Sequence, residues 1–226
     1  MIDTNYNYIK FNNFPEEYVQ RLRALAEEVL DEGILGDNPT YKDPSENLRF
    51  ISRNYSHVPF EINGINFFLN FLITLPNAGM WYTHVDLGRT FALNVPLQVN
   101  LEKGYVLVYG GDDHDDKTYP KLGKILDDVS EVTPEIEEIS KDRYAEKYGI
   151  KTDEDFAEYV KSGKIMKIWI NAKESDFEKI YLDKPMVLNA KIPHSWVNHD
   201  DKFRVVASLT AYDDPDKIWE ALTPFL

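Results

Sequence analysis

The sequence contains no cysteine, which excludes disulfides, zinc–cysteine sites, iron–sulfur clusters and thiol nucleophiles. It also lacks an apolar run long enough to span a membrane, since the longest, residues 67–75, is interrupted by Asn70 and Thr74. Positive charge is scarce: 25 Lys and Arg face 39 Asp and Glu, for a net charge of −14. A field of that sign repels phosphate backbones and anionic lipids, so we expect no nucleic-acid and no membrane partner. The N-terminal residues have neither the basic nor the apolar region of a signal peptide, and we expect a cytoplasmic protein.

The composition of the 226 residues favours one packed domain. Hydrophobic residues make up 43% and aromatic residues 13%, which is enough for a sizeable core, so we treat residues 1–226 as a single domain. The acidic excess is concentrated in residues 112–164, which hold 16 acidic and 9 basic residues. Pro134–Tyr148 and Asp153–Val160 show helical patterns with acidic first turns. We therefore predict that residues 112–164 form a helical acidic insertion within the domain.

The rest of the chain has the patterns of strands, with helices near its two ends. β-Branched and aromatic residues dominate from Phe50 to Leu101, as in Ile65–Leu75 and Phe91–Val99. Pro96 lies within the second run and predicts a strand end or a bulge, because proline cannot donate a ladder hydrogen bond. This order favours a mainly β core with flanking helices over alternating βαβ units. Further strands are predicted at Tyr6–Phe11, Met80–Val85, Ile165–Asn171, Met186–Asn189 and Phe203–Tyr212, and helices from Phe14 to the residues before Gly33 and at Pro215–Leu222.

Two of the five histidines have informative neighbours. His84 and Asp86 are two residues apart in a predicted strand, so their side chains point to the same face. His194 follows Ile192-Pro193 110 residues later, next to predicted strands. Two imidazoles and one carboxylate form the facial triad of non-heme Fe(II) oxygenases, which leaves open coordination positions. We therefore predict a metal site made of His84, Asp86 and His194.

An arginine ten residues after His194 suggests a second ligand. Arg204 lies in the apolar run Phe203–Tyr212, where a charged side chain is costly unless it is paired. In a strand it shares a face with Ser208 and Thr210, and such a face can bind a carboxylate. A dicarboxylate that reaches from the metal to Arg204 would be 2-oxoglutarate. We predict that Arg204 binds the distal carboxylate of 2-oxoglutarate and that Ser208 donates a further hydrogen bond to it.

Together these segments resemble the Fe(II)/2-oxoglutarate-dependent dioxygenases, and more narrowly the aspartyl/asparaginyl β-hydroxylase group. The resemblance rests on residues 71–97 (FLITLPNAGMWYTHVDLGRTFALNVPL) and 181–212 (YLDKPMVLNAKIPHSWVNHDDKFRVVASLTAY), roughly a quarter of the chain. In that group a Leu-Pro-Gly-like turn precedes the first histidine, an arginine and a proline-containing strand follow it, and a similar His-to-Arg spacing occurs near the C-terminus. Some members of that group lack a carboxylate at the position of Asp86. This sequence has one, and it therefore contains the full triad of the wider superfamily.

The resemblance implies a double-stranded β-helix, a jelly-roll or cupin-like core. It implies Fe(II) bound by His84, Asp86 and His194, with 2-oxoglutarate as cosubstrate. The expected reaction is the hydroxylation of an amino-acid, peptidyl or small-metabolite carbon, with release of succinate and CO2. The partner would accordingly be a small-molecule or peptidyl substrate, and the sequence leaves the oligomeric state open.

Three further residues are candidates for the surroundings of the metal. Asn94 is an amide in an otherwise apolar strand, so we expect it to face the barrel interior and contact 2-oxoglutarate. Tyr82 shares a face with His84 and is a second candidate for binding 2-oxoglutarate. Arg89 follows five residues after His84 and could pair with a substrate carboxylate.

Two other functions remain open from the sequence. A cupin-like isomerase, or a dioxygenase that does not use 2-oxoglutarate, would bind a metal in the same way but would not need Arg204. An inactive barrel could instead be a binding or structural module, with the acidic insertion as its interaction surface. Arg204 itself has an alternative interpretation as a structural ion pair with Asp200 or Asp201.

Overall fold

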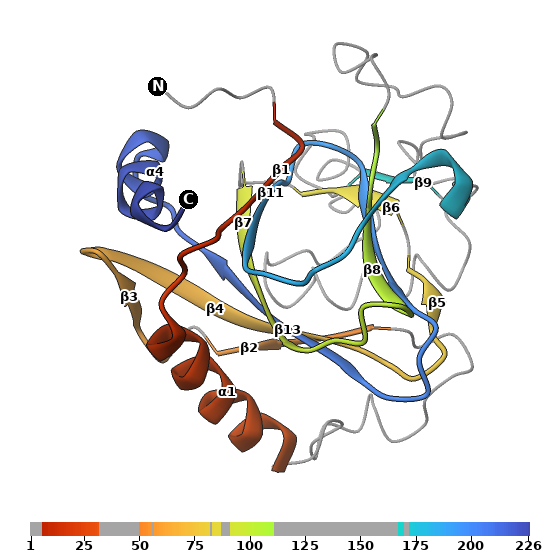
Figure 1. Ribbon diagram of the computed structural model, residues 1–226, viewed down its shortest axis with the longest axis horizontal. Helices are drawn as coiled ribbons and strands as arrows, with labels where there is room; N and C mark the ends of the chain where they lie inside the picture. Colours follow the sequence, from red (N-terminus) through yellow and green to blue (C-terminus); the bar gives the residue numbers. More distant parts are fainter. Residues whose placement is uncertain are drawn as a thin grey trace, which may run out of the picture.

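The computed structural model describes residues 6–31, 50–55, 57–81, 83–86, 91–110, 167–169 and 172–226. In this part the chain is mainly β, with two antiparallel sheets and few helices (Figure 1). This confirms the predicted mainly β class and is consistent with a double-stranded β-helix. The predicted helical insertion, residues 112–164, lies outside the described residues. Of the helices described, none is long and apolar enough to cross a membrane.

The first sheet has the strand order β1–β11–β7–β13–β4–β2, and β3 pairs with β4. The second sheet has the order β10–β8–β12–β6–β9, and β5 pairs with β12. From β4 onward the chain passes to β6, back to β7, across to β8 and β10, and then through β11, β12 and β13 in alternate sheets. This is the winding of a jelly roll. The bounds are β1 (Tyr8–Lys10), β2 (Phe50–Asn54), β3 (Phe60–Ile62), β4 (Ile65–Thr74), β5 (Gly79–Met80), β6 (Thr83–Val85), β7 (Phe91–Gln98), β8 (Gly104–Val108), β9 (Lys167–Trp169), β10 (Glu178–Ile180), β11 (Met186–Asn189), β12 (His194–Asn198) and β13 (Arg204–Thr210).

Helices α1 (Glu16–Asp31) and α4 (Pro215–Leu222) have local sequences that favour their starts. Two glutamates occupy the first turn of α1, where the helix dipole favours negative charge. The carboxylate of Asp214 caps α4 by accepting a hydrogen bond of 2.9 Å from the backbone N–H of Asp216. Single-turn 3-10 helices at Glu174–Asp176 (η4) and Thr223–Phe225 (η5) complete the helical segments that the structure describes.

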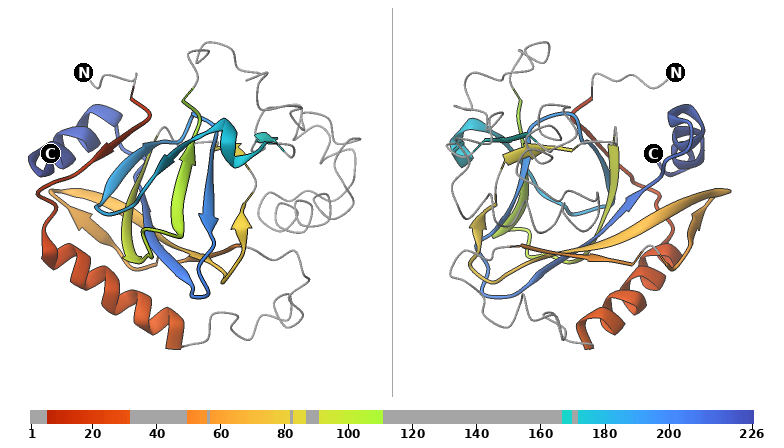
Figure 2. Two further views of the ribbon diagram at one scale, coloured as in Figure 1. Left: turned by 45° about the vertical axis from the view of Figure 1, so that its right-hand side comes forward. Right: turned by 180° about the vertical axis from the view of Figure 1, so that it is seen from behind.

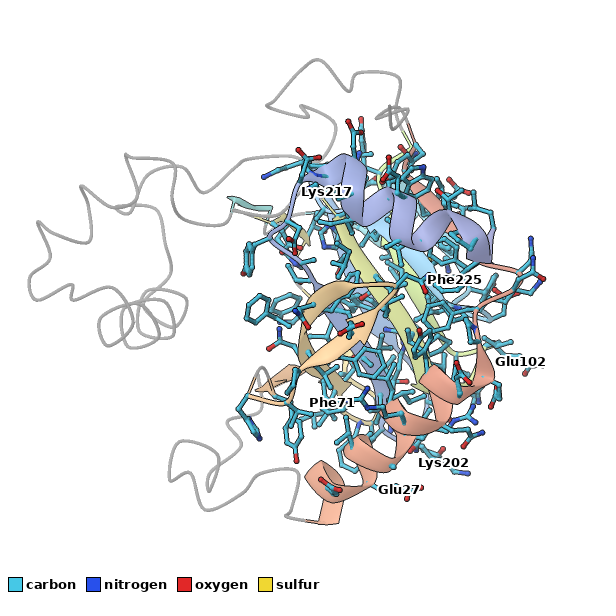
Figure 3. All side chains as sticks on the ribbon, turned by 90° about the vertical axis from the view of Figure 1, so that its left-hand side faces the viewer. Glu27, Phe71, Glu102, Lys202, Lys217 and Phe225 are labelled. Atoms are coloured by element: carbon cyan, nitrogen blue, oxygen red, sulfur yellow. The ribbon has the colours of Figure 1, made fainter. Side chains whose placement is uncertain are left out.

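Both helices cover the outer face of the first sheet (Figure 3). Alternate residues of β4, among them Phe71, pack in one cluster with Leu22 of α1 and Leu222 of α4. The ring of Phe225 lies between the helices, 6.2 Å from the ring of Tyr18 in α1 (centroid to centroid). This layer buries the apolar stripe of each helix, which is the main source of stability for short helices.

The other faces of the same strands form the interior between the sheets (Figure 2). Leu72 of β4 and Val206 of β13 pack there with Trp196 of β12 and Val106 of β8. The central strand β13 is therefore buried on both faces along its whole length. A polar side chain on its inner face is cut off from water and must find its partners inside the barrel.

The sequence predictions matched most strands but missed three, β8, β10 and β12. The register between β7 and β13 shifts between Val205 and Val206, opposite Gln98 and Pro96, so Pro96 lies at a bulge, one of the two outcomes predicted. Strand β8 was not predicted, and the chain around His194 is itself a strand, β12, rather than a segment beside strands. The predicted strand Met80–Val85 is divided into β5 and β6.

Candidate metal and cosubstrate site

His84, Asp86 and His194 converge at one point, although 110 residues separate the two histidines. One ligand atom from each side chain lies within 4.8 Å of the others. The Nε2 atom of His84 is 3.7 Å from Oδ1 of Asp86, and Nε2 of His194 is 3.9 Å from Oδ2 of the same carboxylate. Metal–ligand bonds of about 2.0–2.2 Å let a single ion bridge such separations. The sequence-predicted triad is therefore brought together.

Strand pairing produces this convergence. His194 opens β12 and lies directly opposite His84 of β6, and the two imidazole centroids are 4.4 Å apart. Asp86 follows the end of β6, where its backbone N–H donates a 2.8 Å hydrogen bond to the carbonyl of Ala190. The ammonium group of Lys191 donates to the Asp86 carbonyl at 3.2 Å. These backbone contacts hold the carboxylate at the end of the sheet, beside both histidines.

A hydrogen bond fixes the orientation of one histidine. The Nδ1 atom of His194 is 2.8 Å from the carbonyl oxygen of Ile192. Since a carbonyl can only accept, Nδ1 carries the proton and donates, and Nε2 lies on the side of the ring toward Asp86. Metal-binding histidines are commonly oriented in this way by a backbone carbonyl.

Arg204 is the unusual residue of the interior. Its side chain is buried, with 2% of its surface exposed, and none of its three guanidinium nitrogens has a hydrogen-bond partner among the described residues. Burial lowers the pKa of Arg204 from 12.5 to about 9, so the group still carries its charge at neutral pH. The alternative ion pair with Asp200 or Asp201 is wrong, because the guanidinium nitrogens have no partner among the described residues; the Asp200 carboxylate lies 3.7 Å from Nζ of Lys103 instead.

Two residues of the second sheet receive the Arg204 side chain. The guanidinium carbon lies 4.6 Å from the centroid of the Trp196 ring, a cation–π contact. A Cβ atom built on Gly104 would come within 3.1 Å of the Arg204 Cδ atom, so the glycine makes room for the side chain. Arg204 thus reaches from the first sheet across the interior to β8 and β12. Trp196 is two residues from His194 and shares its face of β12.

The turn between β12 and β13 is held by Asn198. Its amide donates to the carbonyls of Thr74, Leu75 and Lys202, and its Oδ1 accepts from the N–H of Asp200. Both polar atoms of this buried amide therefore have partners: the NH2 group contacts three carbonyls and the oxygen accepts one bond. Asn198 thus holds the turn that leads into Arg204.

The remaining predicted residues divide into two groups. Asn94 and Ser208 are buried and lie side by side in register on β7 and β13, on the inner face. Tyr82 and Arg89 fall outside the described residues. Trp196 and Gly104 were not predicted. For Trp196 a signal was present, because alternation in a strand puts its side chain on the same face as that of His194.

These residues fit a divalent metal with a dicarboxylate. Two imidazoles and a carboxylate, with no thiolate, form the donor set of a 2-His-1-carboxylate site. The buried guanidinium without a partner fits an anion that arrives from outside the chain, because an uncompensated buried charge is otherwise costly. Both observations concern the same interior and support each other.

Comparison with known proteins finds similarity only among solved structures. No protein-family model and no curated protein matches the chain. The α-ketoglutarate-dependent carbocyclase SnoK from nogalamycin biosynthesis is 12% identical, with a TM-score of 0.44 over 90% of this chain and 78% of that one. HygX from Streptomyces hygroscopicus, with nickel and 2-oxoglutarate bound, is 11% identical, with a TM-score of 0.42 over 89% and 80% of the two chains. The epimerase SnoN is 12% identical, with a TM-score of 0.39 over 90% and 77%.

Proposed function

We propose that the protein is an Fe(II)- and 2-oxoglutarate-dependent oxygenase. The observation that carries the proposal is the pairing of a convergent His-Asp-His triad with a buried, unpaired arginine in the same interior. An isomerase or a dioxygenase without 2-oxoglutarate would need the triad but not the costly guanidinium. An inactive binding module would need neither.

His84, Asp86 and His194 would hold the metal, and Arg204 would bind the distal carboxylate of 2-oxoglutarate. When bound, Fe(II) and 2-oxoglutarate supply O2 activation coupled to oxidative decarboxylation, which releases succinate and CO2. The bond from Nδ1 to the Ile192 carbonyl orients the His194 imidazole, whose Nε2 would be the metal ligand. Trp196 and Gly104 fix the direction of the Arg204 side chain.

The apolar lining of the interior would keep water away from the reacting groups. Val106, Val206 and Trp196 are buried around the path between the triad and Arg204. Their low polarity strengthens the attraction between a guanidinium and a carboxylate, which in bulk water would be weak. The chain's own contribution is thus to orient two ligands in a dry, preformed space.

We further propose hydroxylation as the outcome, at an amino-acid, peptidyl or small-metabolite carbon. The support is the resemblance of residues 71–97 and 181–212 to the aspartyl/asparaginyl β-hydroxylase group. The full triad, with Asp86, is the feature in which this chain departs from some members of that group.

Anaerobic spectroscopy tests the proposal without knowledge of the substrate. Addition of Fe(II) and 2-oxoglutarate to the purified protein should produce a visible charge-transfer band, because the cosubstrate chelates the iron. The variant His84→Ala should lose the band, whereas His57→Ala, which changes an exposed histidine, should keep it. A folded wild-type protein without the band, or an equal band in His84→Ala, would refute the proposed site. Succinate formed under air would then measure turnover.

A further inference from the structure

A row of polar side chains crosses the inner face of the first sheet. Pairing registers place Asn94 of β7 opposite Ser208 of β13, and Ser208 opposite Asn70 of β4. All three alternate along their strands with residues of the outer cluster, such as Leu93 and Leu209. We call Asn94, Ser208 and Asn70 the amide row. It carries hydrogen-bond donors and acceptors but no charge.

Two members of the amide row are buried without the partners that such groups require. Asn94 and Ser208 are each 1% exposed. The Oδ1 of Asn94 and the Oγ of Ser208 have no hydrogen-bond partner in the part of the chain that the structure describes, and the Asn94 amide makes one long bond of 3.4 Å to the Ala92 carbonyl. A buried polar group left unpaired costs about 1–3 kcal/mol. These unpaired atoms point to a ligand that supplies the missing bonds.

The geometry separates the amide row from the expected position of 2-oxoglutarate. Ser208 is four residues from Arg204, which is about 13 Å along a strand. The Arg204 side chain contacts Trp196 and Gly104 of the second sheet, and both histidines of the triad also belong to that sheet. The four carbon–carbon bonds of the cosubstrate, about 1.5 Å each, span less than about 6 Å. A cosubstrate that spans the triad and Arg204 therefore lies along the second sheet. The amide row, on the opposite sheet, is not occupied by it.

An exposed aromatic pair extends the same face. Phe68 lies two residues from Asn70 on β4 and pairs in register with Thr210, two residues from Ser208. Its ring is 5.3 Å from that of Tyr212 (centroid to centroid), and the two residues are 43% and 71% exposed. Exposed apolar side chains that lie together can mark a contact surface for a ligand or partner. The face thus offers neutral hydrogen bonding beside the site and an apolar surface farther out.

We propose that the amide row and the Phe68–Tyr212 pair bind the primary substrate, and that this substrate is neutral where it contacts the row. It presents a hydroxyl or amide group to Asn94 and Ser208, and a ring or apolar side chain to the aromatic pair. This inference rests on the proposed function and replaces the prediction that Asn94 and Ser208 bind 2-oxoglutarate. A carboxylate or phosphate at the row would lack a cation, since neither amides nor a hydroxyl can neutralise it.

A titration of 2-oxoglutarate into the Fe(II)-loaded protein without oxygen tests the first half. Ser208→Ala and Asn94→Leu should bind the cosubstrate within about threefold of the wild type, while Arg204→Met should bind it at least about 30-fold more weakly. Equal weakening in Ser208→Ala and Arg204→Met would overturn the inference and leave the proposed function standing. Unchanged affinity in Arg204→Met would instead count against the proposed function.

A thermal readout guards against a merely structural role. Because Ser208→Ala and Asn94→Leu remove unpaired polar atoms, both should raise the melting temperature of the ligand-free protein by about 2–4 °C. A fall of the same size in both variants would show that the side chains stabilise the fold, and would overturn the inference.

The second half is tested with matched neutral and charged probes. N-acetyl-L-phenylalaninamide and phenyl β-D-glucopyranoside carry a ring and a neutral amide or hydroxyl group, while N-acetyl-L-phenylalanine and phenyl β-D-glucuronide add one carboxylate. Affinities for the protein loaded with Zn(II) and 2-oxoglutarate are measured by ligand-observed NMR. At least one neutral probe should bind about tenfold more tightly than its charged counterpart, and lose that preference in Ser208→Ala. Which of the two neutral probes binds then shows whether the site recognises an amide or a hydroxyl group. Equal binding of the charged probes, or no binding by either neutral probe, would overturn the proposed class.

Discussion

Two polar clusters, one on the outer face of the second sheet and one on the inner face of the first sheet, differ in how their groups are paired. On the outer face, the Tyr105 hydroxyl donates to Oε2 of Glu174 at 2.6 Å, and Nε2 of His199 donates to Oε1 of the same carboxylate at 2.9 Å. Lys179 donates to the Tyr105 oxygen at 3.1 Å and lies 3.4 Å from the Glu174 carboxylate. Each of these groups has its partner within the chain.

The inner cluster is the reverse. Arg204, Asn94 and Ser208 are more deeply buried than Glu174, yet the three Arg204 nitrogens, the Asn94 Oδ1 and the Ser208 Oγ lack hydrogen-bond partners among the described residues. Folding alone would select against such an arrangement, because burial without hydrogen bonds costs free energy. The comparison teaches that satisfied networks mark structure and unsatisfied ones mark a place for a ligand. Asn198, which is interior but fully bonded, belongs with the structural kind.

The largest effect is expected from the triad. His194→Ala should abolish the band formed by Fe(II) and 2-oxoglutarate, because a site with only two protein ligands binds the metal much more weakly. His199→Ala removes a histidine of the outer cluster and should leave the band intact. If the band survives in His194→Ala, then His194 binds metal no more than the outer-cluster histidine does, and the prediction is wrong.

Next in size is the loss of cosubstrate affinity in Arg204→Met. Removal of a charged partner from a buried pair costs about 2–5 kcal/mol, or about 30-fold or more in dissociation constant. Calorimetric titration of 2-oxoglutarate into the Zn(II)-loaded protein measures it. The matched substitution Arg21→Met, on the exposed face of α1, should change the affinity by less than twofold. Similar affinities for the wild type and Arg204→Met would place the cosubstrate elsewhere.

Asn198→Ala should lower stability without touching the ligands. It removes the hydrogen bonds of Asn198 to two carbonyls at the end of β4 and to one carbonyl and one N–H of the β12–β13 turn. We therefore expect a loss of about 2–4 kcal/mol in the free energy of unfolding. Urea denaturation of the ligand-free protein measures this. Ser208→Ala is the matched comparison, because its free energy of unfolding should increase. Stabilisation by Asn198→Ala would contradict the division into bonded and unbonded groups.

Gly104→Ala should weaken 2-oxoglutarate binding by several-fold. The new methyl group would lie 3.1 Å from Cδ of Arg204 and 3.2 Å from the Asn100 carbonyl oxygen, so the arginine has to shift. The metal affinity should not change, because the triad lies at the other end of β12. Gly110→Ala, whose Cβ would have ordinary contacts of 3.8 Å or more, is the control. Equal cosubstrate affinity in both variants would mean that Arg204 is not positioned by β8.

The smallest effect belongs to the outer cluster. Burial alone would raise the pKa of Glu174, but hydrogen bonds from Tyr105 and His199 outweigh it and lower the pKa below 4.5. An acid with a lowered pKa stabilises the fold above its unfolded pKa, and this contribution is lost as the pH falls through the folded pKa. Glu174→Gln should therefore cost about 1 kcal/mol or less at pH 7, and the difference in melting temperature should shrink below about pH 4.5. A difference that grows on acidification would contradict this assignment.

Much of this architecture was predictable from the sequence, because alternation within a strand fixes which side chains share a face. His84 with Asp86, and Arg204 with Ser208, follow from that rule alone. The role of Trp196 was not predictable, since it depends on which strand of the second sheet Arg204 reaches across the interior. Nor could the sequence show that Ser208 and Arg204 serve different ligands: they share a face, but only the three-dimensional path of the arginine side chain separates them.

Strand registry was also beyond the sequence. The amide row exists because β4, β7 and β13 pair with Asn70, Asn94 and Ser208 in line, and a shift of one residue in any strand would turn its member outward. The resemblance to known oxygenases likewise gave the order of the motifs but not this pairing.

The central claim, that unpaired interior groups bind ligands, is tested most directly by ligand-dependent melting. With Zn(II) present, 2-oxoglutarate at about 100 times its dissociation constant should stabilise the wild type by about 2.7 kcal/mol, or about 5–10 °C. Arg204→Met should start from a higher melting temperature, because an apolar side chain replaces a buried unpaired charge, and should gain nothing from 2-oxoglutarate. A wild type that gains nothing, or an Arg204→Met protein that gains as much as the wild type, would contradict the account.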